Sequence, residues 1–190
     1  AGLSGQDPYD RTGLFRAGAE PDDGNAPEQH RPRAGTGRVQ FRRGGFGGAP
    51  KFPHPTSLER LLRHWAASIH GAEPDRQAET AVLVTLRKMA LGGIYDHLGG
   101  GFYRYSVDAE WQIPHFEKML YDNGPLLALY AQAWRATRDP LFRAVAEETG
   151  EWVMREMQSP DGGYHATLDA DSEGEEGKFY LWTPDQIRTL

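Results

Sequence analysis

The segment from residue 95 to residue 123 has the densest collection of polar and aromatic side chains in the sequence. Four of them could exchange protons with a ligand as catalytic groups, namely Asp96, Asp108, His115 and Glu117. Six others could hold a ligand, namely Arg104, Tyr105, Trp111, Tyr121, Asp122 and Asn123. Carboxylates and imidazoles move protons at sugar hydroxyl and anomeric positions, while aromatic rings stack on sugar C–H surfaces. The segment therefore predicts a small-molecule, carbohydrate-like ligand and acid/base chemistry.

Each of these residues also has a structural interpretation. Long loops need buried Asp, Arg and His side chains to satisfy their own backbone groups. Arg104 could instead bind a ligand carboxylate or phosphate through two parallel hydrogen bonds. Asp122-Asn123, just before Pro125, is typical of a helix N-cap. The residue types alone leave site and scaffold open.

A second acidic segment covers residues 169–177, where Asp169, Asp171 and Glu173 are further candidate ligand-binding residues. They occupy the first, third and fifth positions of an EF-hand-like loop, with Gly174 at the sixth. The twelfth position is Tyr180 where calcium binding needs Glu, so no classical calcium site is expected. The chain has no cysteine, which excludes disulfides and thiolate sites. We predict no metal and no cofactor.

Helical periodicity and capping patterns predict the elements that carry these loops. The expected helices run from Thr56, with Glu59 at capping-box spacing, to Gly71, then over 75–91, from Asn123 onward, over 139–158 and from Thr183 onward. Hairpins are expected between 101–105 and 111–113 and between 164–168 and 179–182, with a helical turn at 116–121. Trp65, Trp134 and Trp152 are expected in the core, whereas Trp111 and Trp182 lie in loops and could stack on a ligand.

A Gly-Gly-aromatic sequence recurs at 44–46, 100–102 and 162–164, with a pair of helices between successive copies. Helical hairpins that repeat in this way cannot bury their apolar faces singly and must stack or close into a ring. The alternative is three independent loops that merely use glycine.

Residues 1–43 contain few large apolar side chains and many Gly, Pro, Asp and Arg residues. We predict a linker or loosely held arm there. The formal net charge of −6 argues against nucleic acid as a partner. No apolar stretch is long enough to cross a membrane and no signal peptide is recognisable, so a cytoplasmic location is expected.

Four strings resemble one family closely: GGFGGAPKFPHP (44–55), GGIYDHLGGGFYRYSVDAEW (92–111), IPHFEKMLYDN (113–123) and DADSEGEEGKFYLWT (169–183). It is the YyaL-type family, related to the spermatogenesis-associated thioredoxin-domain protein. The resemblance implies a thioredoxin-like domain joined to a six-hairpin α/α toroid, similar to N-acylglucosamine 2-epimerases and six-hairpin glycosidases. The cysteine motif of the thioredoxin-like domain has no counterpart in this sequence.

The resulting fold prediction is a mainly α chain, an incomplete (α/α)6 toroid with long Gly/aromatic loops and short β-hairpins. Residues 44–190 are expected to be its first part, truncated at the C-terminus. The function predicted is that of a sugar isomerase, epimerase or glycoside hydrolase. One alternative is a non-catalytic binding or scaffold module that partners a thioredoxin-like domain. Another is a prenyltransferase- or terpene-cyclase-like toroid, which the charged residues of 95–123 disfavour.

Overall fold

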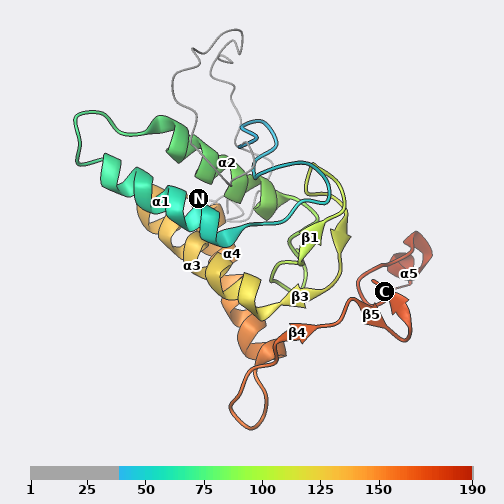
Figure 1. Cartoon of the computed structure of the whole chain (residues 1–190). Helices are drawn as coiled ribbons and strands as arrows, with labels where there is room; N and C mark the ends of the chain where they lie inside the picture. Colours follow the sequence, from blue (N-terminus) through green and yellow to red (C-terminus); the bar gives the residue numbers. More distant parts are fainter. Residues whose placement is uncertain (1–38, 190) are drawn as a thin grey trace, which may run out of the picture. The chain divides into compact units, whose positions relative to one another are not determined.

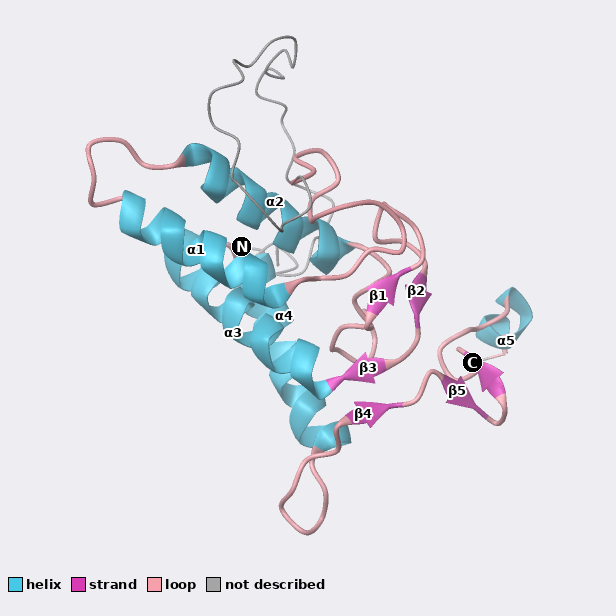
Figure 2. Cartoon of the chain, viewed as in Figure 1, coloured by secondary structure: helices cyan, strands magenta, loops and turns pink. Residues whose placement is uncertain are grey.

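A computed structural model of the chain describes residues 39–189. Helices predominate, and the strands are short (Figures 1 and 2). The helices are α1 (Pro55–Ser68), α2 (Arg76–Leu91), α3 (Leu120–Thr137), α4 (Pro140–Trp152), which continues as a π-helical turn over Val153–Met157, and α5 (Pro184–Arg188). The strands are β1 (Tyr105–Ser106), β2 (Pro114–His115), β3 (Lys118–Met119), β4 (Thr167–Leu168), β5 (Asp171–Ser172) and β6 (Glu175–Glu176).

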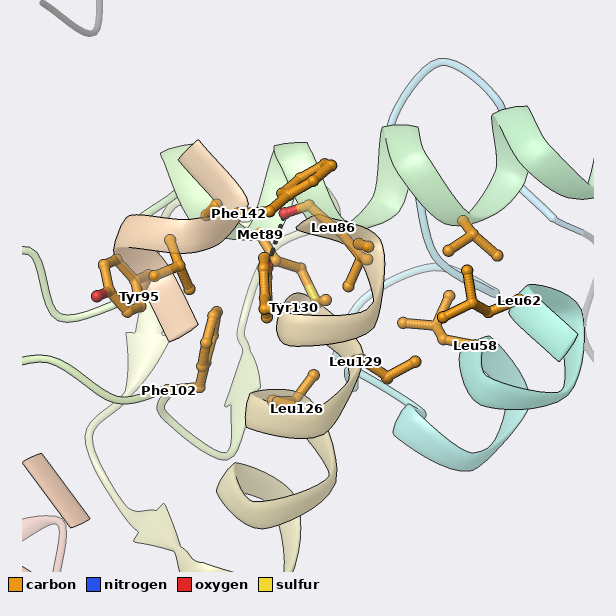
Figure 3. Packing of buried hydrophobic residues seen from close by; sticks show 14 of the residues in the cluster. Leu58, Leu62, Leu86, Met89, Tyr95, Phe102, Leu126, Leu129, Tyr130 and Phe142 are labelled. Atoms are coloured by element: carbon orange, nitrogen blue, oxygen red, sulfur yellow. Dashed lines mark hydrogen bonds between the residues drawn. The ribbon is translucent and has the colours of Figure 1, made fainter. Parts of the chain in front are cut away.

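The first four helices form two stacked helical hairpins. α1 packs on α2 and α3 on α4, while α1 also contacts α3 and α2 contacts α4 (Figure 1). Between the hairpins lies an apolar core in which Leu58, Leu86, Leu126 and Phe142 are almost fully buried (Figure 3). The Tyr130 hydroxyl in this core donates a hydrogen bond of 2.7 Å to the Leu86 carbonyl. Stacking therefore buries the faces that single hairpins would leave exposed.

Short connections join the helices at one end of the hairpins, and the long loops lie at the other end. The strands pair as three separate two-stranded antiparallel sheets: β1 with β2, β3 with β4, and β5 with β6. In Figure 2 the labelled strands lie to the right of the first four helices, with β3 leading into the first turn of α3. All the candidate site residues belong to this loop end.

Several element predictions are confirmed. Asp139 caps α4 by accepting a hydrogen bond from the Leu141 amide, and Thr183 forms a capping box with Gln186 at the start of α5. α2 begins after Asp75, whose carboxylate accepts from two backbone amides. These ends are set by local side-chain hydrogen bonds, which sequence reveals.

Other element predictions are wrong. α1 begins at Pro55 after His54, so the expected capping box at Thr56 and Glu59 is not used. α3 begins at Leu120, which places Asp122 and Asn123 inside its first turn rather than at its cap.

The expected strand pairings also shift. β1 at Tyr105–Ser106 pairs with Pro114–His115, further along the chain than predicted. Thr167–Leu168 pairs with Lys118–Met119 instead of with 179–182, and β3 replaces the expected helical turn at 116–121. Each of these partners is decided by tertiary packing, because two-residue strands carry no periodicity of their own.

Two of the three Gly-Gly-aromatic copies occupy equivalent settings. Gly45 and Gly101 both have positive φ, +73° and +80°, and a Cβ at either would collide with an indole ring, of Trp111 and Trp152 respectively. A buried lysine ammonium lies over each ring. Lys51 is 4.7 Å from the Trp111 centroid, and Lys118 is 5.1 Å from the Trp152 centroid. The predicted repeat is thus real for the first two copies. At the third copy, Cβ atoms at the two glycines would meet open space.

Residues 39–43, within the expected arm, are tied to the helical body. Val39 bridges Phe46, and the Trp111 indole donates a hydrogen bond of 2.9 Å to the Arg43 carbonyl. The rest of the predicted arm, 1–38, lies outside the described residues. Within the described part of the chain, no helix has both the length and the apolar character that a bilayer crossing requires.

Candidate functional site

Six side chains from separate parts of the chain meet at the loop end of the hairpins, and we call them the Arg104 cluster. They come from the residues beside β1, from the extended segment 114–119, from the first turn of α3 and from β6, and are Arg104, Tyr105, His115, Glu117, Asp122 and Glu176. Five of the six were predicted as site residues. Glu176 was not.

An ion pair lies at the centre of the cluster. The Arg104 Nη1 donates a hydrogen bond of 2.6 Å to the Glu117 Oε2, and the Arg104 amide donates to the Glu117 carbonyl at 2.7 Å. The guanidinium is about two-fifths exposed and the carboxylate about one-fifth. One bond holds the Glu117 backbone and the other its carboxylate, and the ion pair offsets the Arg104 charge that a ligand anion would need.

His115 is held on its face and on one edge. The Tyr105 ring stacks on the imidazole with centroids 4.7 Å apart and planes 15° apart. The His115 Nδ1 lies 2.6 Å from the Glu176 Oε1, while its Nε2 lies 3.9 Å from the Glu117 Oε2. A ligand oxygen about 2.8 Å from both the Nε2 and the Oε2 would fit this separation.

Asp122, 9% exposed, lies in the first turn of α3. Burial raises the pKa of its carboxyl to about 6; Arg104 opposes this effect and Glu117 adds to it. A carboxyl with such a pKa can hold or release a proton near neutral pH, as a general acid or base must.

Replacement of Asp122 by Asn should stabilise the folded chain at pH 8 but not at pH 4. The folded-state pKa lies above the unfolded one, so the carboxyl favours folding at low pH and this contribution is lost as pH rises through about 6. Solvent contact and the helix N-terminus offset part of the cost of the charge, so we expect a gain of about 1 kcal/mol at pH 8. Urea unfolding at both pH values measures it; an equal gain at pH 4 would contradict the assignment.

Asp96 lies in a different environment from the Arg104 cluster. Its Oδ2 accepts a hydrogen bond of 2.7 Å from the Lys118 ammonium, and its Oδ1 accepts from the Leu98 and Gly99 amides. Burial alone would raise the pKa of Asp96, but Lys118 and these amides outweigh it and lower the pKa. Lys118 follows Glu117 in an extended segment, so the two side chains point to opposite sides. The structure does not bring Asp96 to His115.

Asp108 and Trp111 serve their own loop. The Asp108 carboxylate accepts hydrogen bonds from the backbone amides of Glu110, Gln112 and Ile113, which outweigh burial and lower its pKa. Trp111 is fully buried beneath Lys51, so its indole is core and the expectation that it stacks on a ligand is corrected.

Two predicted ligand-binding residues on α3 differ in exposure. Asn123 is fully buried; it accepts a hydrogen bond from the Phe102 amide and donates to the Phe102 and Met119 carbonyls. Its amide therefore joins a loop to α3 and has no exposed surface for a ligand. Tyr121 is 58% exposed and lies next to Arg104, at the edge of the cluster.

The acidic segment reaches the cluster through a residue that the sequence reasoning missed. Glu173 pairs with Lys178 at 2.6 Å, and Asp169 accepts a hydrogen bond from the Asp171 amide. From this segment, Glu176 contacts His115. The one local signal is Gly174, because a two-residue hairpin loop favours glycine at its second position, where φ is positive.

The remaining expectations concern a tryptophan and a metal. Trp182, expected to stack on a ligand, is half exposed near α5. In the part of the chain that the structure describes, no three His, Asp or Glu side chains are grouped so that they could hold a metal ion.

The two stacked hairpins with their long loops at one end match part of an (α/α)6 toroid, the fold of the structural neighbours. A sugar epimerase from a ruminal bacterium superposes with a TM-score of 0.56 at 15% identity, over 72% of this chain and 39% of that one. Cellobiose 2-epimerase from Spirochaeta thermophila gives 0.57 at 20% identity, over 69% and 34%. At such identities the likeness shows the fold alone.

Sequence similarity identifies homologues over most of this chain. Spermatogenesis-associated protein 20 of rat is 44% identical over 154 residues, 77% of this chain and 19% of that protein. The human protein is 42% identical over the same length. Over these residues the chain is a homologue of spermatogenesis-associated protein 20, a YyaL-type family. The chain spans about one fifth of the length of these curated relatives. No protein-family model matches it.

Proposed function

We propose that the Arg104 cluster forms one wall of a carbohydrate site in which His115 transfers a proton. The observation that carries the proposal is the position of the His115 Nε2, 3.9 Å from a Glu117 carboxylate that Arg104 fixes. An imidazole can accept and return a proton near neutral pH, as isomerisation or epimerisation next to a carbonyl group requires. Asp122, with a pKa of about 6, is the second acid/base candidate.

The charge of the cluster favours an uncharged ligand. Arg104 is paired with Glu117, and Asp122 and Glu176 add negative charge without a further cation in the cluster. A ligand phosphate or carboxylate would meet this excess of acids. We therefore replace the hypothesis that Arg104 binds an anionic ligand group: in this proposal Arg104 positions the Glu117 carboxylate. Tyr105 and Phe52, which is about one-third exposed, have rings 4.9 Å apart and offer apolar faces beside the cluster.

The other walls of such a site would come from outside these residues. The chain covers 39% of the epimerase toroid from the ruminal bacterium. Asp96, Asp108 and Asn123, predicted as site residues, act in this proposal as the scaffold that holds the loops. A thioredoxin-like domain, if present, would be a neighbour of the toroid and not a part of the site.

Exchange of a sugar C–H proton with solvent tests the chemistry. The full-length protein is incubated with a panel of neutral aldoses in D2O, and loss of the proton next to the carbonyl is followed by NMR. We expect exchange that falls by about 10²–10⁴-fold in His115→Ala, the usual contribution of a general base. His70→Ala, at the opposite end of the hairpins, is the matched control and should exchange normally. Undiminished exchange in His115→Ala would rule out its role.

A non-catalytic binding module is the second candidate. Its support is that Arg104 and His115 already have carboxylate partners within 2.6 Å, as in a scaffold. In that case sugars would bind without exchange, and His115→Ala would change affinity alone. Binding measured by calorimetry alongside the exchange assay separates the two candidates.

A further inference from the structure

We propose that Glu176 is a positioning residue that sets which nitrogen of His115 carries the proton. The inference rests on the proposed function, because it explains how the Nε2 of His115 is kept free for a ligand. It extends that function to the segment after the second helical hairpin, since Glu176 belongs to the loop that leads toward α5.

The hydrogen-bond chemistry of the pair fixes the tautomer. An ionised carboxylate only accepts hydrogen bonds, so the Nδ1 that lies 2.6 Å from the Glu176 Oε1 must be the donor. In the neutral imidazole the proton then resides on Nδ1, and the lone pair is on Nε2. That nitrogen faces the Glu117 carboxylate across 3.9 Å, the place where a ligand hydroxyl would sit.

The fold delivers Glu176 to this place by a tight hairpin. Glu173 and Gly174, with φ of 54° and 80°, form the two-residue turn between β5 and β6. The register pairs Asp171 with Glu176. The hairpin is bounded by Gly177, where a Cβ would lie 2.5 Å from the Phe116 ring, so only glycine allows this approach.

The same contacts hold the hairpin against the segment that carries His115. Phe116 stacks on Tyr180, just after the hairpin, with centroids 5.4 Å apart and planes 7° apart. Within the hairpin segment itself, the Phe179 amide donates to the Ser172 hydroxyl at 2.9 Å. Neighbouring residues of the hairpin thus meet neighbouring residues of this segment: Gly177 lies against Phe116, and Glu176 lies against His115.

Stability is a poor explanation for this ion pair. The Glu176 side chain is 50% exposed, and exposed pairs contribute little to folding. Orientation of His115 is a better explanation. Stacking on Tyr105 fixes the plane of the imidazole but allows the ring to turn within that plane, and a hydrogen bond at the ring edge stops this turning. A base oriented by a third group is the arrangement of catalytic triads.

The tautomer of His115 in the full chain, labelled with ¹⁵N-histidine, tests the inference without any substrate. Long-range ¹⁵N–¹H correlation spectra at a pH where the ring is neutral report which nitrogen is protonated. We expect protonation at Nδ1 in the wild type and a shift toward Nε2 in Glu176→Ala. Glu175→Ala, the exposed neighbour on β6, is the matched control and should leave the spectrum unchanged.

Glu176 has no positioning role if His115 keeps its tautomer in Glu176→Ala, or if Glu175→Ala alters it equally. Turnover gives the second readout: kcat should fall about tenfold or more in Glu176→Ala while KM stays within about twofold, as for loss of an orienting group. A tautomer shift without any sugar turnover in the wild type would retain Glu176 as the partner of His115 and reject the proposed function instead.

Discussion

Replacing Asp96 by alanine lowers the free energy of unfolding by an expected 3–5 kcal/mol, on the order found when one partner of a buried ion pair is removed. The Lys118 ammonium is 1% exposed, and the Asp96 carboxylate at 2.7 Å is its charged partner. It also lies 4.9 Å from the Tyr103 ring centroid and 5.1 Å from that of Trp152, so truncation of Asp96 would leave a cation enclosed by aromatic rings. Urea unfolding of the full chain measures the loss.

Two variants separate this effect from the loss of loop hydrogen bonds. Asp108→Ala removes a carboxylate that also binds backbone amides. Within residues 39–189 it forms no ion pair with a buried cation and acts on the buried Lys51 only through a weaker electrostatic effect, so the cost should be only about 1–2 kcal/mol. Asp96→Ala combined with Lys118→Met removes both charges and should recover most of the stability. A cost for Asp96→Ala no larger than that for Asp108→Ala would contradict the structural role and return Asp96 to the list of catalytic candidates.

Gly101→Ala is expected to destabilise the chain by about 3 kcal/mol or more. Gly101 has φ of +80°, which costs an L-residue about 1–2 kcal/mol. Its Cβ would also lie 2.7 Å from ring atoms of the fully buried Trp152, so the indole or the loop must move. Overpacking of this kind adds about 1–3 kcal/mol.

Gly174→Ala is the matched control for the backbone term. Gly174 has the same φ of +80°, but a Cβ there meets nothing within 4 Å. Its cost should therefore be the backbone term alone, and the difference between the two variants measures the contact with Trp152. If both variants lost the same free energy of unfolding, the loop at Gly101 would accommodate a Cβ without strain. The close contact with an indole ring, shared by Gly45 and Gly101, would then not be what requires glycine there.

The sequence by itself determined the helices and the presence of a repeated architecture. Apolar residues at helical spacing marked α1, α2, α3 and α4, and the carboxylate and hydroxyl caps of α4 and α5 marked their starts. These signals are local, since each depends on residues three or four positions apart. The Gly-Gly-aromatic copies indicated stacked hairpins before any contact between them was visible. Five of the six residues of the Arg104 cluster were also recognisable by type.

Only the tertiary structure decided which of those residues meet. A helical turn was expected at 116–121, and on a helix residues two apart, such as His115 and Glu117, do not face each other. The segment is extended, where residues two apart share a face, and so both join the cluster. Asp96 and Lys118, of opposite charge, meet on the other side of that segment. Glu176 contacts His115 across 61 residues of chain. Such pairings depend on strand register and on packing between hairpins, which no local pattern of residues encodes.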